Sequence, residues 1–246
     1  MGDCPSPAAD AEAAPAAIQS RLPPESFAAA LRAVIFDMDG LMLDTERWER
    51  AAWRESAARH GHALSDEFFA SLVGRRESDT LPRMRAYFGP QFPFESARQE
   101  ARARFDHWIA HCPRPAKPGL MPLLELLEQR GIALAVASST RRARAQLRLR
   151  ELLMRFRVSV FGDEVEHAKP HPQIYQRALA ALGTGPGETL ALEDSPPGWS
   201  AAAAAGLTAI VIPDLLPPPP QAPYVCRSLG DVEAWVRGSA TRPGVA

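Results

Sequence analysis

The carboxyl-terminal half of the chain alternates short apolar runs with longer segments in which apolar residues recur every three or four positions. The short runs predict buried strands, and the longer segments predict amphipathic helices. We expect strands over residues 34–36, 132–137, 158–161, 189–193 and 207–212. We expect helices over residues 120–130, 141–156, 172–182, 196–205 and 229–236. This alternation predicts an α/β fold with a Rossmann-like three-layer core, in which right-handed crossovers build a parallel sheet covered on both faces.

A block without any strand pattern interrupts this alternation directly after the first strand. Its periodicity predicts four helices, over residues 45–60, 65–72, 78–87 and 95–111, separated by glycine and proline breaks. We therefore divide the chain into an α/β core, residues 31–47 and 116–246, and a helical cap domain, residues 48–115. Because the block follows the first strand, the cap is expected to cover the carboxyl edge of the sheet.

The first 30 residues are rich in alanine and proline, which predicts a disordered extension with a short helix near residues 27–31. They lack the basic start and apolar block of a signal peptide. No apolar run approaches the ~20 residues needed to span a bilayer. The three cysteines, Cys4, Cys112 and Cys226, are far apart. We therefore expect no disulfide framework and a cytoplasmic location.

The charge of this 246-residue chain is nearly balanced, with a net charge of −1 and no basic stripe interleaved with aromatic residues. This argues against nucleic-acid partners, and we expect a monomer that acts on a small metabolite. The arginines of residues 141–150 are spread around a helix, which favours a solvated face. His107 and His111 beside Cys112 have a spacing compatible with zinc. No further ligand is evident there, so an ordinary helix face is the preferred interpretation.

Carboxylates follow two of the predicted strands. Asp37 and Asp39 come directly after the first apolar run, and Glu193 and Asp194 end the run at 189–193. Ligands of open α/β sheets bind at the carboxyl ends of the strands. Four acids crowded there would repel one another unless a cation were bound, and oxygen ligands suit Mg²⁺. The sequence therefore predicts a magnesium site at this edge.

Other strand ends supply groups suited to a phosphate. Ser138 and Ser139 end the strand at 132–137, where hydroxyl and backbone N–H groups can bind phosphate oxygens. Lys169 precedes a helix and can offset charge on a carboxylate or a phosphoryl group. Each residue alone has an ordinary interpretation, as a helix cap or a surface lysine. Thr45 could cap the first cap helix or contact substrate, and Arg75 could be a surface residue or a second contact to substrate.

Four motifs occur in order along this chain: Asp37-Met38-Asp39-Gly40, then Ser138, Lys169, and the pair Glu193-Asp194. In this order and context the chain resembles the haloacid dehalogenase-like hydrolase superfamily over about residues 32–237. The small helical insert resembles that of the subfamily of β-phosphoglucomutase and sugar-phosphate phosphatases. The segments Lys169-Pro170-His171-Pro172 and 192–198 are similar to sequence motifs of that subfamily.

The resemblance implies a phosphoric monoester hydrolase with Mg²⁺ as cofactor. Asp37 would attack phosphorus to give an aspartyl-phosphate, and Asp39 would protonate the leaving oxygen and then activate water. Asp37, the backbone carbonyl of Asp39 and Asp194 would hold the metal, with Glu193 ordering its ligands or waters. Ser138, Ser139 and Lys169 would bind the phosphoryl oxygens. The substrate would be a small phosphorylated metabolite, such as a sugar or polyol phosphate.

Two alternatives remain open. A mutase of the β-phosphoglucomutase type is less favoured, because the histidine that its cap carries shortly after the Asp-Thr pair is absent from residues 45–49. A non-catalytic protein that binds phosphometabolites would be expected to have lost one of the four motifs. Dehalogenases lack the second aspartate supplied here by Asp39. Phosphonate hydrolases need a cap lysine, and residues 48–115 contain none.

Overall fold

The computed structural model describes residues 4–5, 18–113 and 115–239. Its strands are β1 (Ala33–Phe36), β2 (Ala133–Ser138), β3 (Val158–Phe161), β4 (Thr189–Glu193), β5 (Thr208–Val211) and β6 (Tyr224–Val225). Its α-helices are α1 (Glu25–Ala30), α2 (Thr45–Arg59), α3 (Asp66–Ala70), α4 (Glu77–Phe88), α5 (Phe94–His111), α6 (Leu120–Gln129), α7 (Arg142–Leu149), α8 (Gln173–Leu182), α9 (Pro196–Ala204) and α10 (Leu229–Gly238). Short 3₁₀ helices are η1 (Arg150–Arg155), η2 (Gly162–Glu164) and η3 (Pro186–Glu188).

The strands form one sheet in the order β3-β2-β1-β4-β5-β6, and the paired strands run parallel. This confirms the predicted fold class, including the insertion of helices after the first strand. The register aligns Phe36 at the end of β1 with Val136 of β2 and Leu192 of β4. The residues that follow these three strands therefore meet at one edge of the sheet.

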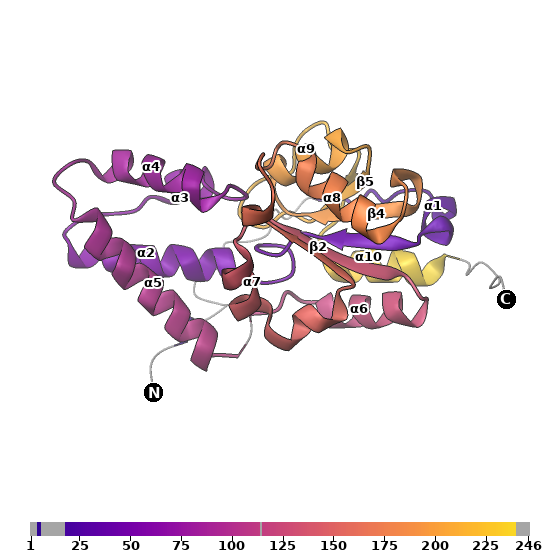
Figure 1. Ribbon diagram of the computed structural model, residues 1–246, viewed down its shortest axis with the longest axis horizontal. Coiled ribbons are helices and arrows are strands. Elements are labelled where there is room, and N and C mark those ends of the chain that lie inside the picture. The colour runs from indigo at the N-terminus through magenta and orange to yellow at the C-terminus, as the bar shows by residue number, and fades with distance from the viewer. Residues whose placement is uncertain (1–3, 6–17, 114, 240–246) are drawn as a thin grey trace.

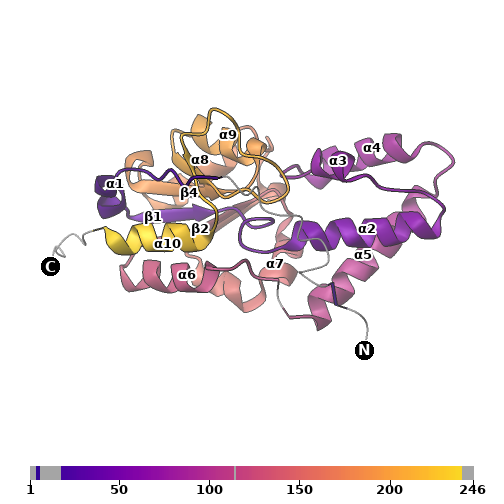
Figure 2. The ribbon, with the colours of Figure 1, turned by 180° about the vertical axis from the view of Figure 1, so that it is seen from behind.

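The sheet lies between two layers of helices, as Figures 1 and 2 show. Alternate residues of β1 pack against opposite layers. Val34 and Phe36 pack with apolar residues of α6, α7 and α10. Ala33 and Ile35 point the other way, into a cluster with α8 and α9. Because both faces of a parallel sheet are buried, its strands read as continuous apolar runs rather than alternating ones. All four residues of β1 are fully buried.

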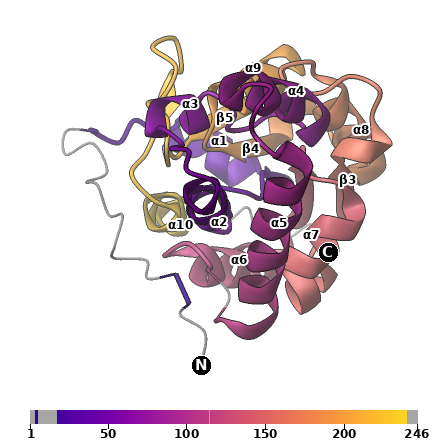
Figure 3. The same ribbon diagram turned by 90° about the vertical axis from the view of Figure 1, so that its left-hand side faces the viewer.

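Helices α2 to α5 have an apolar cluster of their own, built around residues such as Trp53, Phe88 and Phe105. Figure 3 shows these helices in front of the sheet when it is viewed from their side. The two chain segments that join them to the core converge on one carboxylate, Asp214. Arg47 at the start of α2 and Lys117 before α6 both donate to Asp214 Oδ1, the latter at 2.6 Å.

Two segments depart from the sequence-based expectations. Residues 18–30, placed in the disordered extension, lie along the core: Arg21 pairs with Val225, and Trp235 Nε1 donates to the carbonyl of Pro23 at 3.0 Å. Of residues 1–17, all but Cys4 and Pro5 lie outside the described residues. The helix expected over 141–156 ends at Leu149, because Arg150 adopts a positive φ of 51° and starts the 3₁₀ helix η1.

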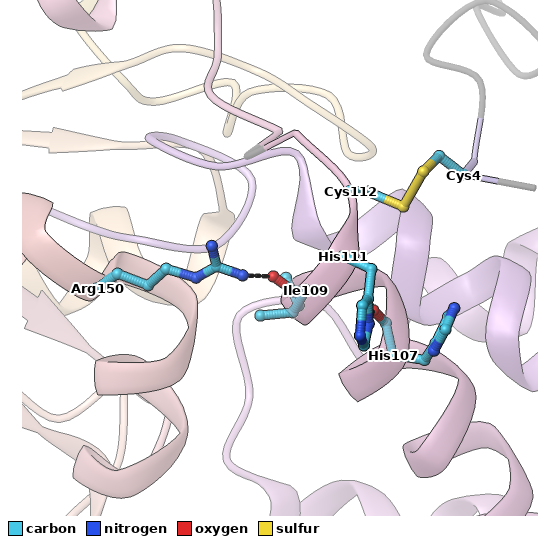
Figure 4. The surroundings of a disulfide bond; sticks show 6 residues. All are labelled: Cys4, His107, Ile109, His111, Cys112 and Arg150. Carbon is cyan, nitrogen blue, oxygen red and sulfur yellow. Dashed lines mark hydrogen bonds between the residues drawn. A yellow bond between two sulfur atoms is a disulfide. The ribbon is translucent and has the colours of Figure 1, made fainter. Parts of the chain in front are cut away.

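A disulfide joins Cys4 to Cys112 at the end of α5, with Cα atoms 5.7 Å apart (Figure 4). The expectation that the cysteines stay unpaired is therefore wrong for this pair. A separation of 108 residues carries no spacing signal, since the pairing depends on where the amino-terminal segment runs in space. The argument for a reducing compartment, which relied on unpaired cysteines, no longer holds.

The same bond removes Cys112 from any zinc site. His111 Nδ1 lies 2.9 Å from the carbonyl of His107, and the two imidazole rings stack with centroids 4.4 Å apart. Both contacts are typical of neighbouring side chains on a helix surface, as preferred from the sequence. No helix among the described residues has the length and apolar character needed to cross a membrane.

Candidate active site

Four charged groups from three strand ends meet at the carboxyl edge of the sheet. The backbone N–H of Asp37 donates to Leu192 of β4 at 3.0 Å, which sets the nucleophile candidate beside Glu193. Lys169 Nζ donates to Asp37 Oδ1 and to Glu193 Oε1, both at 2.6 Å. It also donates to the carbonyl of Ala137 in β2 at 2.9 Å. The lysine thus ties together groups that are far apart in the sequence.

Both carboxylate oxygens of Glu193 accept hydrogen bonds from neighbouring side chains. Its Oε1 accepts from Lys169 and from the hydroxyl of Tyr175, and its Oε2 accepts from Ser195 at 3.3 Å. Neither Tyr175 nor Ser195 was among the predicted site residues. These donors hold the carboxylate in one orientation, which fits a residue that orders its neighbours better than one that binds a metal with both oxygens.

Asp194 differs in that its Oδ2 atom is buried and accepts no hydrogen bond from the residues that the structure describes. Carboxylate oxygens of Asp37, Glu193 and Asp194 lie within 4.8 Å of one another. A buried, unpaired carboxylate oxygen is costly unless a cation satisfies it. A hard divalent cation such as Mg²⁺ takes oxygen ligands of this kind, so the chemistry of these residues fits that metal.

The glycine of the first motif makes room for this arrangement. Gly40 has a φ of +85°, in the left-handed region that favours glycine. A Cβ atom added there would lie 2.1 Å from Asp194 Oδ2. A side chain at position 40 would therefore displace the carboxylate that has no other partner.

Burial dominates the electrostatics of the cluster. It raises the pKa of Asp37 to about 7; Lys169 opposes this rise and the neighbouring Glu193 carboxylate adds to it. Burial, followed by the charges of Asp37 and Glu193, raises the pKa of Asp194 well above its ordinary value. Burial alone would lower the pKa of Lys169, but its two carboxylate partners raise it. The lysine is therefore charged, and it faces an excess of carboxylates.

Asp39 lies apart from this cluster and has its own set of donors. Its Oδ1 accepts from Thr45 and from Arg148, both at 2.5 Å, and its Oδ2 accepts from Thr140 at 2.7 Å. Thr45 was predicted to cap α2 or to contact substrate. The cap position is Asp44, and the Thr45 hydroxyl donates to Asp39. Arg148 is 7% exposed, so the interpretation of a solvated arginine face is wrong for this residue.

The helical part of the chain closes over this edge through a turn at Gly74, where φ is +75°. A Cβ atom on Gly74 would lie 2.6 Å from the hydroxyl of Ser195. Ser139 Oγ, predicted to bind phosphate, donates to the carbonyl of Gly74 at 3.2 Å. Ser138 is buried, and its hydroxyl accepts from the backbone of Thr140 at 3.1 Å.

A pocket lies between the sheet edge and helices α2 to α5. Asp37, Asp39 and Ser138 line it from the core, and Arg75 lines it from the opposite side. Arg75 is exposed, and its Nε donates to the carbonyl of Ser71 at 3.2 Å. The arrangement brings the buried carboxylate of Asp37 and the carboxylate of Asp39 to one cavity, with the ammonium of Lys169 in contact with Asp37. This combination can carry out phosphoryl transfer.

Comparison with known proteins agrees with this geometry. The sequence pattern of the haloacid dehalogenase-like hydrolases matches residues 31–206. The chain belongs to this family. It is 32% identical over 182 residues to the phosphorylated carbohydrates phosphatase of Thermotoga maritima, covering 73% of this chain and 84% of that protein. It is 28% identical over 186 residues to the β-phosphoglucomutase of Bacillus subtilis, covering 73% and 82%.

Among solved structures, a mutant of CbbY from Rhodobacter sphaeroides in complex with xylulose-(1,5)bisphosphate superposes with a TM-score of 0.71. It is 27% identical, and the match covers 82% of this chain and 96% of that one. The recognised family and the predicted enzyme class, a phosphatase of the haloacid dehalogenase type, are confirmed at this level. Both a phosphatase and a mutase of phosphorylated carbohydrates are thus found among the proteins that this chain resembles.

Proposed function

We propose that this protein is a Mg²⁺-dependent phosphatase that hydrolyses a small phosphorylated sugar or polyol through an aspartyl-phosphate intermediate. The observation that carries the proposal is the buried contact of Lys169 with Asp37, beside the unpaired oxygen of Asp194. It gives a nucleophile kept in place by a cation and a neighbouring site for a divalent metal. The relatives named above, which act on phosphorylated carbohydrates, support the substrate class.

In the first step an oxygen of Asp37 attacks phosphorus, and the bond from phosphorus to the ester oxygen breaks. Asp39 gives a proton to that leaving oxygen, so the product departs as an alcohol. Ser138, Ser139 and Lys169 would bind the phosphoryl oxygens, and Arg75 would contact the rest of the substrate.

In the second step Asp39 takes a proton from water as that water attacks phosphorus. The aspartyl-phosphate bond breaks, which restores Asp37 and yields inorganic phosphate. Asp37, Asp194 and the backbone carbonyl of Asp39 would hold Mg²⁺, and Glu193 would order its surroundings. When bound, the metal neutralises charge on the phosphoryl group.

Hydrolysis is favoured over the mutase reaction by the start of α2. Where the mutase subfamily has a histidine shortly after the Asp-Thr pair, this chain has residues 45–49, which end in Glu49. The Glu49 carboxylate pairs with Arg148 at 3.2 Å. Without an imidazole at this place, retention and re-transfer of the phosphoryl group are less favoured than hydrolysis.

The direct test is phosphate release from a panel of sugar and polyol phosphates with Mg²⁺, comparing the wild type with Asp37→Asn. We expect the substitution to reduce release by at least about a thousandfold, because it removes the nucleophile. Equal release by both proteins would overturn the nucleophile assignment. Conversion of β-glucose 1-phosphate to the 6-phosphate without free phosphate would favour the mutase instead. Binding of the same compounds without turnover would favour a non-catalytic binding protein.

A further inference from the structure

Arg148 is a buried cation that none of the four family motifs includes. It projects from α7, a helix of the core, and its side chain is 8% exposed. The guanidinium donates to Asp39 at 2.5 Å and to Glu49 at 3.2 Å, and it lies 4.8 Å from the ring centroid of Phe105. Burial would lower the pKa of Arg148, but the two carboxylates raise it. The group therefore stays charged between them.

The two oxygens of Asp39 have partners of different kinds. Oδ1 accepts from the guanidinium of Arg148 and from Thr45, whereas Oδ2 accepts only from Thr140 among the described residues. A guanidinium can donate but never accept, whereas a hydroxyl can do either. A proton on Oδ1 would face the guanidinium of Arg148, which cannot accept it, although the Thr45 hydroxyl on the same oxygen can reverse its direction. A proton on Oδ2 would face a hydroxyl that can reverse its direction.

The other contacts of Arg148 come from the helices that cover the site. Glu49 belongs to α2 and Phe105 to α5, while Asp39 belongs to the loop that follows β1. Movement of α2 and α5 away from the core would separate Arg148 from Glu49 and Phe105, while its contacts with Asp39 and Thr140 of the core would remain. The orientation of Asp39 is thereby linked to the position of those helices.

We propose that Arg148 is a positioning residue for Asp39. By anchoring Oδ1 it presents Oδ2 as the atom that passes the proton to the leaving oxygen and later accepts one from water. Its contacts with Glu49 and Phe105 make this presentation depend on closure of α2 and α5 over the site. The inference rests on the proposed function, in which Asp39 is the acid and base.

A neighbouring arginine supplies a matched control. Arg144 lies one turn earlier on α7, and it also reaches the covering helices: its Nη1 donates to both carboxylate oxygens of Asp106, at 2.6 and 2.8 Å. No contact between Arg144 and Asp39 is present among the described side chains. Arg144→Met therefore removes a comparable link between α7 and α5 without touching the acid and base.

The experiment compares two probes of similar shape, phenyl phosphate and 4-nitrophenyl phosphate, with Mg²⁺. Phenolate is the poorer leaving group and needs the proton more, whereas 4-nitrophenolate leaves readily without it. The ratio kcat/KM reports the steps up to transfer onto Asp37, so it isolates proton donation from the later water step. The variants are Arg148→Met, Arg148→Lys and Arg144→Met, each checked for folding by its thermal melting curve.

We expect Arg148→Met to lower kcat/KM for phenyl phosphate about tenfold more than for 4-nitrophenyl phosphate, through kcat rather than KM. Arg148→Lys should recover part of this difference, since an ammonium can still donate to Oδ1. Arg144→Met should lower kcat/KM for both substrates by the same factor. Equal losses for both substrates in Arg148→Met would overturn the proposal and indicate phosphate binding or a purely structural role. Undiminished release by Asp37→Asn would instead overturn the proposed function.

Discussion

At the scale of single residues, the site depends on one cation that serves two buried carboxylates. Lys169 contacts Asp37 and Glu193, yet Asp194 stays without a partner among the described residues. Removing one member of a buried ion pair leaves the other charge uncompensated, which costs more than an exposed pair ever contributes. Stability and metal binding should therefore both respond strongly to changes at these positions.

Substitution Lys169→Met should lower the free energy of unfolding by about 3–5 kcal/mol, because Asp37 and Glu193 lose their common partner. Urea unfolding followed by circular dichroism measures this. Arg237→Met is the control: Arg237 pairs with Glu233 at the surface with its side chain 63% exposed, so its loss should cost at most about 1 kcal/mol. Similar losses in the two variants would contradict the compensating role of Lys169.

Binding of Mg²⁺ should weaken as the pH falls. Burial raises the pKa of Asp37 to about 7, with Lys169 opposing and Glu193 adding to the rise. Below that pH the folded protein holds a proton on Asp37 that the metal must displace, and the raised pKa of Asp194 acts in the same direction. We expect the affinity to fall by at least roughly tenfold per pH unit below about pH 7, as for one or more released protons. Titration calorimetry measures this.

The metal prediction has its own control. Asp194→Asn removes a charge from the same site and should reduce Mg²⁺ affinity at every pH tested. It should also reduce the rise in melting temperature that Mg²⁺ produces in the wild type. An affinity that stays constant between about pH 6 and about pH 8 would contradict the participation of Asp37.

At the scale of elements, the turn between α3 and α4 brings the helical insert onto the core. Gly74 lies against Ser195 of the loop before α9, and its carbonyl accepts from Ser139. The contact leaves no space for a Cβ atom. The backbone of this turn therefore lies directly against the core at the edge of the pocket.

Gly74→Ala should therefore reduce kcat/KM by about tenfold or more, because a Cβ atom would collide with Ser195 and prevent full closure. Gly183→Ala is the matched control. Gly183 also has a positive φ, of +71°, but a Cβ there meets nothing within 4 Å. Both variants should lose roughly 1–2 kcal/mol of stability from backbone strain, while only Gly74→Ala loses activity. Equal activity in the two would contradict the closure contact.

At the scale of the whole molecule, segments from both ends of the chain secure the fold. Arg21 pairs with Val225 at the edge of the sheet, and Trp235 of α10 donates to Pro23. Cys4 is joined to Cys112, next to the segment that returns from α5 to the core. The amino-terminal segment thus contacts both the sheet layer and the helical insert.

Thiol counting tests this arrangement. The purified, unreduced protein should show one titratable thiol after denaturation and three after reduction, since only Cys226 is free. In the native state Cys226 should react slowly, because burial raises its pKa to about 12. Three thiols without reduction would contradict the disulfide. Cys226→Ala should remove the thiol titrated in the denatured, unreduced protein and leave the disulfide intact.

By itself the sequence determined the succession of strands and helices along the chain and the polar groups that follow the strands. Buried parallel strands read as apolar runs, and the residues after them are local in sequence, so Asp37, Lys169 and Glu193 could be predicted to meet. Only the tertiary structure decided which side chains from more distant segments contact the residues at these strand ends. The burial of Arg148 against Asp39 depends on how α7 turns toward the core. The disulfide of Cys4 depends on the path of a segment that no periodicity describes.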